Sequence, residues 1–402
     1  MKQPLNAVVA GHLCIDIFPN LENFPKGKFL NAFKPGRLLQ VGGAQFSTGG
    51  PVSNTGLALQ HLGIPVNLIA KIGNDPFGKI TYDLIKKHGS KLTDGIKVDR
   101  DSITSYSVII SPPGVDRIFL HCPGANDTFS SGDISKDLIK NAALFHFGYP
   151  PLMRKMFINN GAELKKIMRL AKSFNMTTSL DMSYPDPSSE SGKADWQSIL
   201  FSTLPFVDIF LPSLEEILYF LRRETYEELS AKGDILKQAT PDLIHDIGQE
   251  LIDYGVKIVV IKMGERGLYL RTGDQSKLEK CGLARPENWR KWANREMWVP
   301  CFKVELVGTT GAGDATIAGF LSGFLRGMLP EQAISMAVAV GACNVEAADA
   351  LSGLKTWEET IERIEKGWAR LISKVMISEA VDSGWLFDSE NQLWFGPFDD
   401  KN

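Results

Sequence analysis

A glycine-rich turn near residue 311 combines features that suit phosphoryl transfer. The segment Gly311-Ala312-Gly313-Asp314 precedes apolar residues at helical spacing, which predicts a helix over Gly313–Leu325. The first N–H groups of a helix lack internal partners, and glycines let an anion approach them closely. A carboxylate there repels an anion, so Asp314 suggests a base beside a phosphate. The turn favours phosphoryl transfer to a hydroxyl; the alternative is a capped helix in which Asp314 complements the dipole.

The composition excludes several classes of protein. The chain has 402 residues, 44% of them hydrophobic and 23% charged, with a formal net charge of −3. This balance argues against binding to nucleic acid or to a membrane surface. The five cysteines show no C-x-x-C spacing, so neither a zinc site nor a disulfide framework is indicated. No run of 18 apolar residues and no signal-peptide core occurs, so we expect a cytoplasmic protein.

Short β-rich runs alternate with helical patterns along most of the chain. Alternation of this kind predicts an α/β fold, with a mainly parallel sheet flanked by helices on both faces. Ligands of such sheets bind beyond the carboxyl ends of the strands. The expected strands are Ala7–Ala10, Val66–Lys71, Leu144–Phe147, Thr177–Asp181, Val207–Leu211, Lys257–Lys262, Gly267–Arg271 and Phe302–Val307; the expected helices include Phe77–His88, Gly161–Phe174, Pro241–Tyr254, Glu331–Ala347 and Trp357–Ser373.

Two regions without crossover helices interrupt this alternation, near residues 29–46 and 105–121. The second reads as a β-hairpin, with Pro112-Pro113-Gly114 at its turn. Antiparallel pieces inserted into a parallel domain are typical of a small lid. We therefore expect one large domain over residues 1–375 that includes the lid strands, and a C-terminal tail, 376–402, packed on it.

A second glycine turn lies nearer the N-terminus. Gly49-Gly50 precedes a helical stretch that has Asn54 in its first turn, and an amide there can both donate and accept hydrogen bonds. Asp16 follows the first strand and is compatible with either a turn cap or a ligand contact. Taken alone, each of these features is also compatible with ordinary helix starts and turns.

Together these motifs resemble the ribokinase-like, or PfkB-type, carbohydrate kinase family. The resemblance spans roughly residues 5 to 375, and the motifs occur in the family's order. It implies the ribokinase-like fold, with a small β-strand lid. The segments that carry it are Asp16, Gly49-Gly50 with Asn54, Leu62-Gly63, Ile72 to Gly78, Ser213 to Glu216, Lys262 to Gly267, and Gly308 to Asp314.

The resemblance implies a role for each matching residue. Asp314 would be the general base that takes the proton from the sugar hydroxyl, and the amides of Gly311, Ala312 and Gly313 would form the anion hole. A free Asp pKa of about 3.9 would leave that base ionised at neutral pH. The residues that match the sugar-binding positions are Asp16, Gly49, Gly50 and Asn54; those that match the nucleotide-binding positions are Lys262, Gly264, Gly267 and Asn344.

The implied cofactors are ATP and Mg²⁺, with Glu216 and Asp181 holding the metal through water. Three departures from the family pattern occur. Ser213 replaces the Asn of the family's Asn-x-x-Glu motif, although Glu216 is retained. Gly308 stands where many members place an Asp beside a monovalent cation, so we expect little activation by potassium. The segment from Asp181 to Pro185 lacks the Arg of fructokinase-like members, which weakens an assignment to fructose.

The expected activity is ATP-dependent phosphorylation of a primary hydroxyl of a sugar or sugar acid. Two alternatives stay open: a nucleoside kinase of the same superfamily, and a sugar-binding regulator that has lost turnover. The lid residues Phe46, Tyr106 and Phe119 could wall a nucleobase or could simply pack. A free sheet of so few strands is marginal, so we expect two lids to pair into a homodimer, unless their apolar residues fold onto the large domain and leave a monomer.

Overall fold

The computed structural model describes residues 5–21, 35–36, 38–111, 118–372 and 374–400. Its centre is an 11-stranded sheet. In their order across the sheet, the strands are β14 (Leu386–Asp388), β15 (Leu393–Phe395), β13 (Glu296–Val299), β12 (Leu268–Thr272), β11 (Ile258–Lys262), β10 (Ile209–Phe210), β9 (Thr177–Leu180), β8 (Leu144–Gly148), β1 (Ala7–Gly11), β4 (Val66–Gly73) and β5 (Ile96–Asp99).

The strands from β11 to β5 run parallel, and β12, β13, β15 and β14 extend the sheet with antiparallel pairs. The predicted mainly parallel sheet is therefore confirmed. The predicted strand Phe302–Val307 is wrong, because only Phe302 makes an isolated bridge, to Arg370. Leu306 and Val307 are 65% and 59% exposed, so this apolar run is not covered by a sheet.

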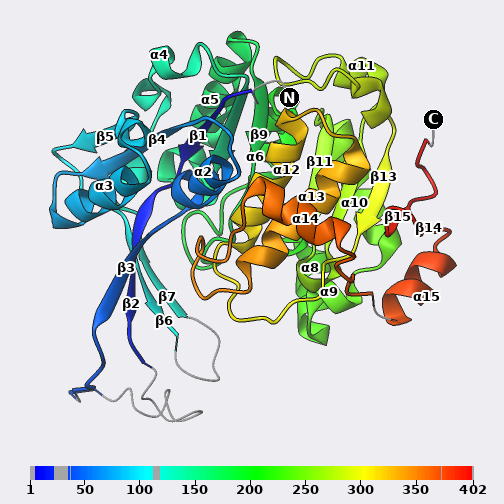
Figure 1. Ribbon diagram of the computed structural model, residues 1–402. Coiled ribbons are helices and arrows are strands. Elements are labelled where there is room, and N and C mark those ends of the chain that lie inside the picture. The colour runs from blue at the N-terminus through cyan, green and yellow to red at the C-terminus, as the bar shows by residue number, and fades with distance from the viewer. Residues whose placement is uncertain (1–4, 22–34, 37, 112–117, 373, 401–402) are drawn as a thin grey trace.

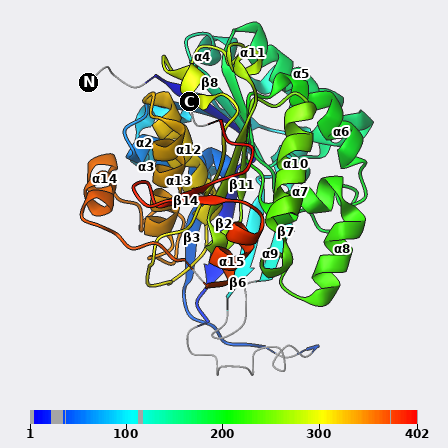
Figure 2. The ribbon, with the colours of Figure 1, turned by 90° about the vertical axis from the view of Figure 1, so that its right-hand side faces the viewer.

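Helices cover both faces of the sheet, as Figure 2 shows. Alternation along each strand divides the core: Ala7 and Val9 of β1 pack on one face, whereas Val8 and Ala10 pack on the other. Helices of the first face are α2 (Pro51–His61), α3 (Pro76–His88), α11 (Gln275–Leu278), α12 (Ala312–Leu325), α13 (Pro330–Asn344) and α14 (Trp357–Glu365). Those of the second are α4 (Lys136–Ile139), α5 (Ala162–Ser173), α6 (Trp196–Thr203), α7 (Leu214–Leu221), α8 (Arg223–Lys232), α9 (Ile235–Gln238), α10 (Pro241–Asp253) and α15 (Lys374–Asp382).

The expected helices agree with the structure within three residues at each end, except for the last one. The helix expected over Trp357–Ser373 stops at Glu365, and Gly367 follows with a φ of 84°, a left-handed backbone that suits glycine. At the start of α3, Asp75 accepts a hydrogen bond from the Gly78 N–H at 2.7 Å and Pro76 takes the first helical position. In the described part of the chain, no helix has both the length and the apolar character needed to cross a bilayer.

A second sheet extends away from the main body in Figure 1. Its strands, in order, are β3 (Ala44–Gly49), β2 (Cys14–Pro19), β6 (Tyr106–Ile110) and β7 (Ile118–Cys122). The expected hairpin is confirmed by antiparallel pairing of β6 with β7. Its tip, 112–117, and residues 29–34 and 37 of the other expected lid region lie outside the described residues. Residues 35–36 and 38–43 form no strand, so the lid prediction near 29–46 holds only for its end.

Strand β2 was not anticipated, because Gly11 to Asp16 reads as the end of β1. The backbone bends at Gly11, where φ is 126° and an added Cβ would lie 2.4 Å from the Gly148 carbonyl oxygen. Only glycine fits this close approach, and the chain leaves the large sheet there to enter the small one. Asp16 therefore belongs to the lid sheet, pairing with Ser47 on β3 and Ser107 on β6.

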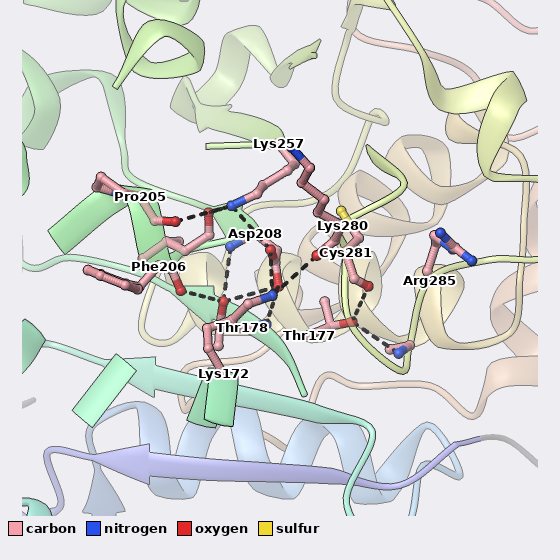
Figure 3. Close-up of polar contacts among 12 residues, drawn as sticks. Lys172, Thr177, Thr178, Pro205, Phe206, Asp208, Lys257, Lys280, Cys281 and Arg285 are labelled. Carbon is pink, nitrogen blue, oxygen red and sulfur yellow. Dashed lines mark hydrogen bonds and ion pairs between the residues drawn. The ribbon is translucent and has the colours of Figure 1, made fainter. Parts of the chain in front are cut away.

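A buried ionic cluster lies at the amino ends of β9, β10 and β11, away from the carboxyl ends where ligands bind (Figure 3). Asp208 is fully buried and accepts hydrogen bonds from Lys172 Nζ at 2.8 Å and from the Thr178 N–H at 2.9 Å. Lys257 Nζ lies 3.4 Å from the same carboxylate. The Asp208 carboxylate thus pairs with two ammonium groups. These ion pairs connect the chain segments that precede β9, β10 and β11.

Candidate active site

The carboxylate of Asp314 lies at the first turn of α12, and it is only 2% exposed. The turn before it depends on Gly311, which has a φ of 71° and whose added Cβ would lie 2.5 Å from Cβ of Ala350. A side chain at that position would be both strained and blocked. Gly311 therefore lets the helix begin close to its neighbours and brings Asp314 into the interior.

Three side chains donate hydrogen bonds to Asp314. Asn54 Nδ2 lies 2.9 Å from Oδ2, and Thr55 Oγ1 lies 3.2 Å from Oδ1. The Tyr149 hydroxyl lies 3.1 Å from each oxygen. The carboxylate is thus held from two directions, by α2 and by the loop after β8. Asn54 was expected to hold a sugar hydroxyl, but its amide contacts the acid, and its Oδ1 accepts from Ser53 Oγ at 3.3 Å.

Burial raises the pKa of Asp314, whereas the donors Asn54, Tyr149 and Thr55 and the charge of Lys262 act in the opposite direction. The pKa of Asp314 therefore lies above the free-Asp value used in the sequence analysis. The four opposing contacts favour the ionised form, the form that can accept a proton.

Tyr149 was missed by the sequence analysis. It directly follows β8, whose strand was predicted, and the carboxyl ends of parallel strands are where ligands bind. That position was the available signal, but a single tyrosine carries no motif. Its backbone N–H donates to Asp181 Oδ1 at 3.2 Å, so Tyr149 links Asp314 with a second predicted site residue.

Asp16, Gly49 and Gly50 meet at the junction of the lid and the large sheet. An added Cβ on Gly49 would lie 2.3 Å from Asp16 Oδ2, and one on Gly50 would lie 2.5 Å from Nδ1 of His12. The two glycines therefore make room for Asp16 and His12. Burial raises the pKa of Asp16 to about 6, and the charge of Asp314 contributes in the same direction.

Two imidazoles stand beside this junction. His12 Nε2 lies 3.4 Å from His121 Nε2, and His121 Nδ1 lies 3.0 Å from Ser107 Oγ. Burial lowers the pKa of His12 and that of His121, so both rings are neutral at physiological pH. Cross-strand pairing places Asp16, Ser107 and His121 side by side, and they form a polar row on the lid.

Lys262 ends β11 and is the cation that the predicted carboxylates share. Its ammonium donates to the Leu211 carbonyl oxygen. Burial raises the pKa of Asp314, Asp181 and Glu216, and the charge of Lys262 opposes that rise. Gly313 lies against it, since an added Cβ would be 3.5 Å from Lys262 Cε. The lysine therefore connects the helix turn with the acidic group.

Ser213, which replaces the Asn of the Asn-x-x-Glu motif, fills a structural role that an Asn could also fill. Ser213 caps α7: its Oγ accepts from the Glu216 N–H at 3.2 Å, while Glu216 Oε2 accepts from the Ser213 N–H at 2.6 Å. Asp181 is fully buried, burial raises its pKa, and its Oδ2 has no hydrogen-bond partner. Among the described residues, no group of three or more His, Cys, Asp or Glu is placed to hold a metal ion directly.

A cavity of about 740 Å³ lies beside the α12 turn. Its volume suits a nucleotide-sized ligand. Asn344 does not line it: this residue is fully buried and donates from Nδ2 to the Ala350 carbonyl at 2.7 Å. The lining includes the predicted residues Glu216, Lys262, Gly264, Gly267, Ala312 and Gly313, with an apolar wall of Leu236, Leu268, Phe302, Val304, Val338, Ala342 and Val345.

The Ala312 amide, which was predicted to belong to the anion hole, makes a hydrogen bond within its own turn. The Ala312 N–H donates to the Thr309 carbonyl at 3.3 Å, in the turn that precedes α12. This bond is longer than most N–H···O hydrogen bonds in proteins. Ala312 and Gly313 both line the cavity.

A second cavity, of about 570 Å³, lies between the lid and the large domain. Ser107, Phe119 and His121 line it from the lid, and Tyr184 lines it from the loop after β9. Phe119 and Tyr184 are 54% and 40% exposed. Tyr106, by contrast, packs against Phe77 with ring centroids 5.5 Å apart, and it does not line this space.

The sequence model of the pfkB family of carbohydrate kinases matches residues 5–357. An uncharacterized sugar kinase of Archaeoglobus fulgidus is 28% identical over 299 residues, which cover 74% of this chain and 98% of that protein. The 2-dehydro-3-deoxygluconokinase of Bacillus subtilis is 26% identical over 327 residues, covering 79% and 86%. The Arabidopsis thaliana ribokinase, solved with ribose and ATP, superposes with a TM-score of 0.66 at 18% identity, covering 89% of this chain and 98% of that one. The chain has the ribokinase-like fold, is a sugar kinase, and belongs to the pfkB family of carbohydrate kinases.

Proposed function

We propose that this kinase transfers the γ-phosphoryl group of ATP to a primary hydroxyl of a sugar or sugar acid. The observation that carries the proposal is the placement of Asp314. Its helix turn borders the 740 Å³ cavity through Gly313, and its side chain is held beside the junction with the lid by Asn54 and Tyr149. Asp314, the proposed base, thus lies between the 740 Å³ cavity, which suits a nucleotide, and the polar residues of the lid.

In the proposed reaction, Asp314 accepts the proton of the acceptor hydroxyl as its oxygen bonds to phosphorus. The bond between phosphorus and the bridging oxygen of ADP breaks in the same transfer. The backbone at Gly311, Ala312 and Gly313 stabilises the charge on the equatorial oxygens, together with the positive end of the helix dipole. Asp16 orients the acceptor by accepting hydrogen bonds from its other hydroxyls.

The donor is proposed to occupy the 740 Å³ cavity. Lys262 supplies the positive charge near the phosphates, and the Gly264–Gly267 turn lets the backbone pass close to them. Mg²⁺ would neutralise charge on the transferring phosphate. The unpartnered Asp181 Oδ2 and the Glu216 carboxylate fit a hydrated ion, because hard cations prefer oxygen ligands and Mg²⁺ retains water.

Glu216→Gln is expected to weaken the magnesium dependence of the rate rather than acceptor binding. A glutamine oxygen can still accept from the Ser213 N–H, so α7 keeps its cap, whereas the negative charge that attracts the hydrated ion is lost. A magnesium titration of the initial rate measures the effect. Glu359→Gln is a matched control, since Glu359 makes the same capping box on α14. Superimposable titrations of wild type and Glu216→Gln would show that Glu216 only caps the helix.

Potassium is expected to change the rate by less than about twofold relative to sodium, since no carboxylate at position 308 favours one ion. An added Cβ on Gly308 would lie 2.9 Å from the Ala347 carbonyl oxygen, so an aspartate at this position would require the backbone to shift. Initial rates in sodium, potassium and a large organic cation provide the comparison. A strong potassium requirement would mean that carbonyl oxygens alone form a cation site.

A homodimer through the lid is also proposed. Cross-strand pairing aligns Phe46, Ile17, Val108 and Leu120 in one row across the four strands, on the face opposite Ser107 and His121. Phe119 lies on the other face of the lid and lines the inner cavity. An apolar row on so small a sheet favours pairing with a second copy.

Sedimentation at micromolar concentration is expected to show a dimer, and Leu120→Glu should convert it to a monomer by placing a charge in the apolar row. Leu120 is 55% exposed, so the variant should fold normally. A 44.4 kDa species at every concentration of wild type, with activity unchanged on dilution, would rule out the dimer.

One observation favours the nucleoside kinase as the second candidate. Phe119 and Tyr184 present partly exposed rings to the 570 Å³ cavity, and aromatic side chains of this kind can stack on a base. If the acceptor is a nucleoside, Phe119→Ala should raise its KM and leave that of a simple sugar unchanged.

ATP consumption with a panel of sugars, sugar acids and nucleosides, with and without magnesium, tests the proposed function. A monosaccharide or sugar acid is expected to give the largest kcat/KM, and magnesium is expected to be required. A nucleoside preference would select the second candidate. Tight acceptor binding without any ATP consumption would indicate a regulator that has kept the fold but not the turnover.

A further inference from the structure

Tyr149 occupies an unusual backbone position at the end of β8. Its φ of 60° and ψ of 47° lie in the left-handed region, which a tyrosine rarely adopts. The conformation is held on both sides: its N–H donates to Asp181 Oδ1 at 3.2 Å, its carbonyl accepts from the Leu152 N–H at 3.0 Å, and Pro150 and Pro151 follow. Strained residues of this kind persist where surrounding contacts determine them, and they concentrate at functional sites.

This backbone directs the phenol onto the carboxylate of Asp314. The hydroxyl lies 3.1 Å from Oδ1 and 3.1 Å from Oδ2, so one donor spans both oxygens. Asn54 and Thr55 bind the same carboxylate, but both come from one turn of α2. These two contacts hold both oxygens from the side of α2, and the donor from the β8 loop holds them from a second direction.

We propose that Tyr149 is a positioning residue for Asp314: its hydroxyl fixes the plane and direction of the carboxylate that accepts the acceptor proton. The inference rests on the proposed function for the proton transfer, but the contact between the two side chains is independent of it. A group that orients a base acts mainly on the chemical step, because the acceptor need not touch it.

The electrostatics of the site agree with this role. The hydrogen bond from Tyr149 lowers the pKa of Asp314, and burial together with the charge of Asp314 raises the pKa of Tyr149, so the phenol stays a donor at neutral pH. The other charged groups that act here are Asp16 from β2, Asp181 after β9, Glu216 from α7 and Lys262 from β11. None of these is altered when the phenol oxygen alone is removed.

Tyr149→Phe tests the proposal, because it removes one oxygen and keeps the ring. Loss of a hydrogen bond to a charged group should lower kcat about 10- to 100-fold, with the KM of the acceptor changed by less than about twofold. The acid limb of the kcat profile should move to higher pH, since Asp314 loses a contact that stabilises its ionised form. The Asp314 pKa can also be read without turnover, from the carboxyl ¹³C resonance that is absent in Asp314→Asn; in Tyr149→Phe this pKa should rise.

Tyr269→Phe is the matched control. Tyr269 is a buried tyrosine that donates to a buried carboxylate, Glu296 Oε1, at 2.9 Å on the antiparallel part of the sheet. The Tyr269→Phe variant should leave kcat, KM and the Asp314 resonance unchanged, whatever its effect on stability. The proposal is overturned if Tyr149→Phe leaves the Asp314 pKa unchanged, or if only the acceptor KM rises, which would make Tyr149 a substrate contact. If wild type phosphorylates no acceptor, the proposed function fails, whereas the resonance still decides the link between Tyr149 and Asp314.

Discussion

Asp314→Asn is expected to lower turnover about 10²- to 10⁴-fold, the range for loss of a positioned acid–base group. An asparagine fits the same space, and its oxygen can still accept from Asn54 or Thr55, so the protein should remain folded. It cannot take a proton from the acceptor hydroxyl. Steady-state rates and nucleotide titrations of wild type and variant make the comparison, and nucleotide binding should change little.

A variant that keeps more than half of the wild-type activity would exclude Asp314 as the base. The pH dependence gives a second check. Because burial raises the pKa of Asp314, turnover should begin to fall at a higher pH than an ordinary Asp would allow. The linked effect on stability has the opposite sign: a raised folded-state pKa contributes stability at low pH that is lost as pH rises through it. Acidification should therefore reduce activity without a matching loss of stability from this group.

Asp208→Asn is expected to lower the free energy of unfolding by about 3–5 kcal/mol, the usual cost of removing one member of a buried ion pair. The reason is visible in Figure 3: Lys172 and Lys257 share this single carboxylate. An amide leaves their charges without compensation, and the side chain of Lys257 is only 9% exposed. Urea denaturation measures the loss.

Two variants sharpen that experiment. Asp208→Asn combined with Lys257→Met should recover part of the lost stability, since replacing both partners by uncharged groups removes the unpaired charge. Asp137→Asn, which breaks the exposed pair with Lys140, should leave the denaturation midpoint unchanged. If Asp208→Asn is as stable as wild type, solvent compensates the two lysines and the cluster does not hold the strands.

The elements that could be predicted are those whose signal is local. Helix α3 shows this well, because Asp75 caps it, Pro76 starts it and the apolar spacing defines its face. The apolar runs of β1, β4, β8 and β11 are likewise buried on both faces of a parallel sheet. Strand β13 was missed, because Glu296 and Trp298 lie in a Trp-rich segment that reads as an insertion. It becomes a strand only through pairing with β12 and β15.

The prediction of a strand over Phe302–Val307 was wrong because this segment lacks a partner strand among the described residues, whereas β13 was missed although it has two. Its residues have the composition of a strand, but within the described part of the chain their only strand-type pairing is the bridge at Phe302. The Val307 N–H instead donates to the Val345 carbonyl, at the end of α13. Pairing is a property of the partner as much as of the segment, so composition overestimates it there.

The candidate site divides in the same way. The glycine turns can be recognised in the sequence, because only glycine suits their backbone. Gly311 has a positive φ, and Gly49 leaves space that a side chain would fill. Ser213 and Glu216 likewise form a capping box within four residues. Asn344 shows the limit of a matched position: it lies on the expected helix, yet its amide faces the Ala350 carbonyl and not the cavity.

The sequence by itself determined the family, the order of its motifs and the local geometry of its turns, because those depend on residues a few positions apart. Only the tertiary structure decided what surrounds Asp314. Its donors Asn54 and Tyr149 lie 260 and 165 residues away along the chain, and the parallel sheet brings their loops to one edge. Burial there raises the pKa of Asp314, while Lys262 opposes that change. Burial and charge at a site are summed over every segment that packs against it, so no single stretch of sequence contains them.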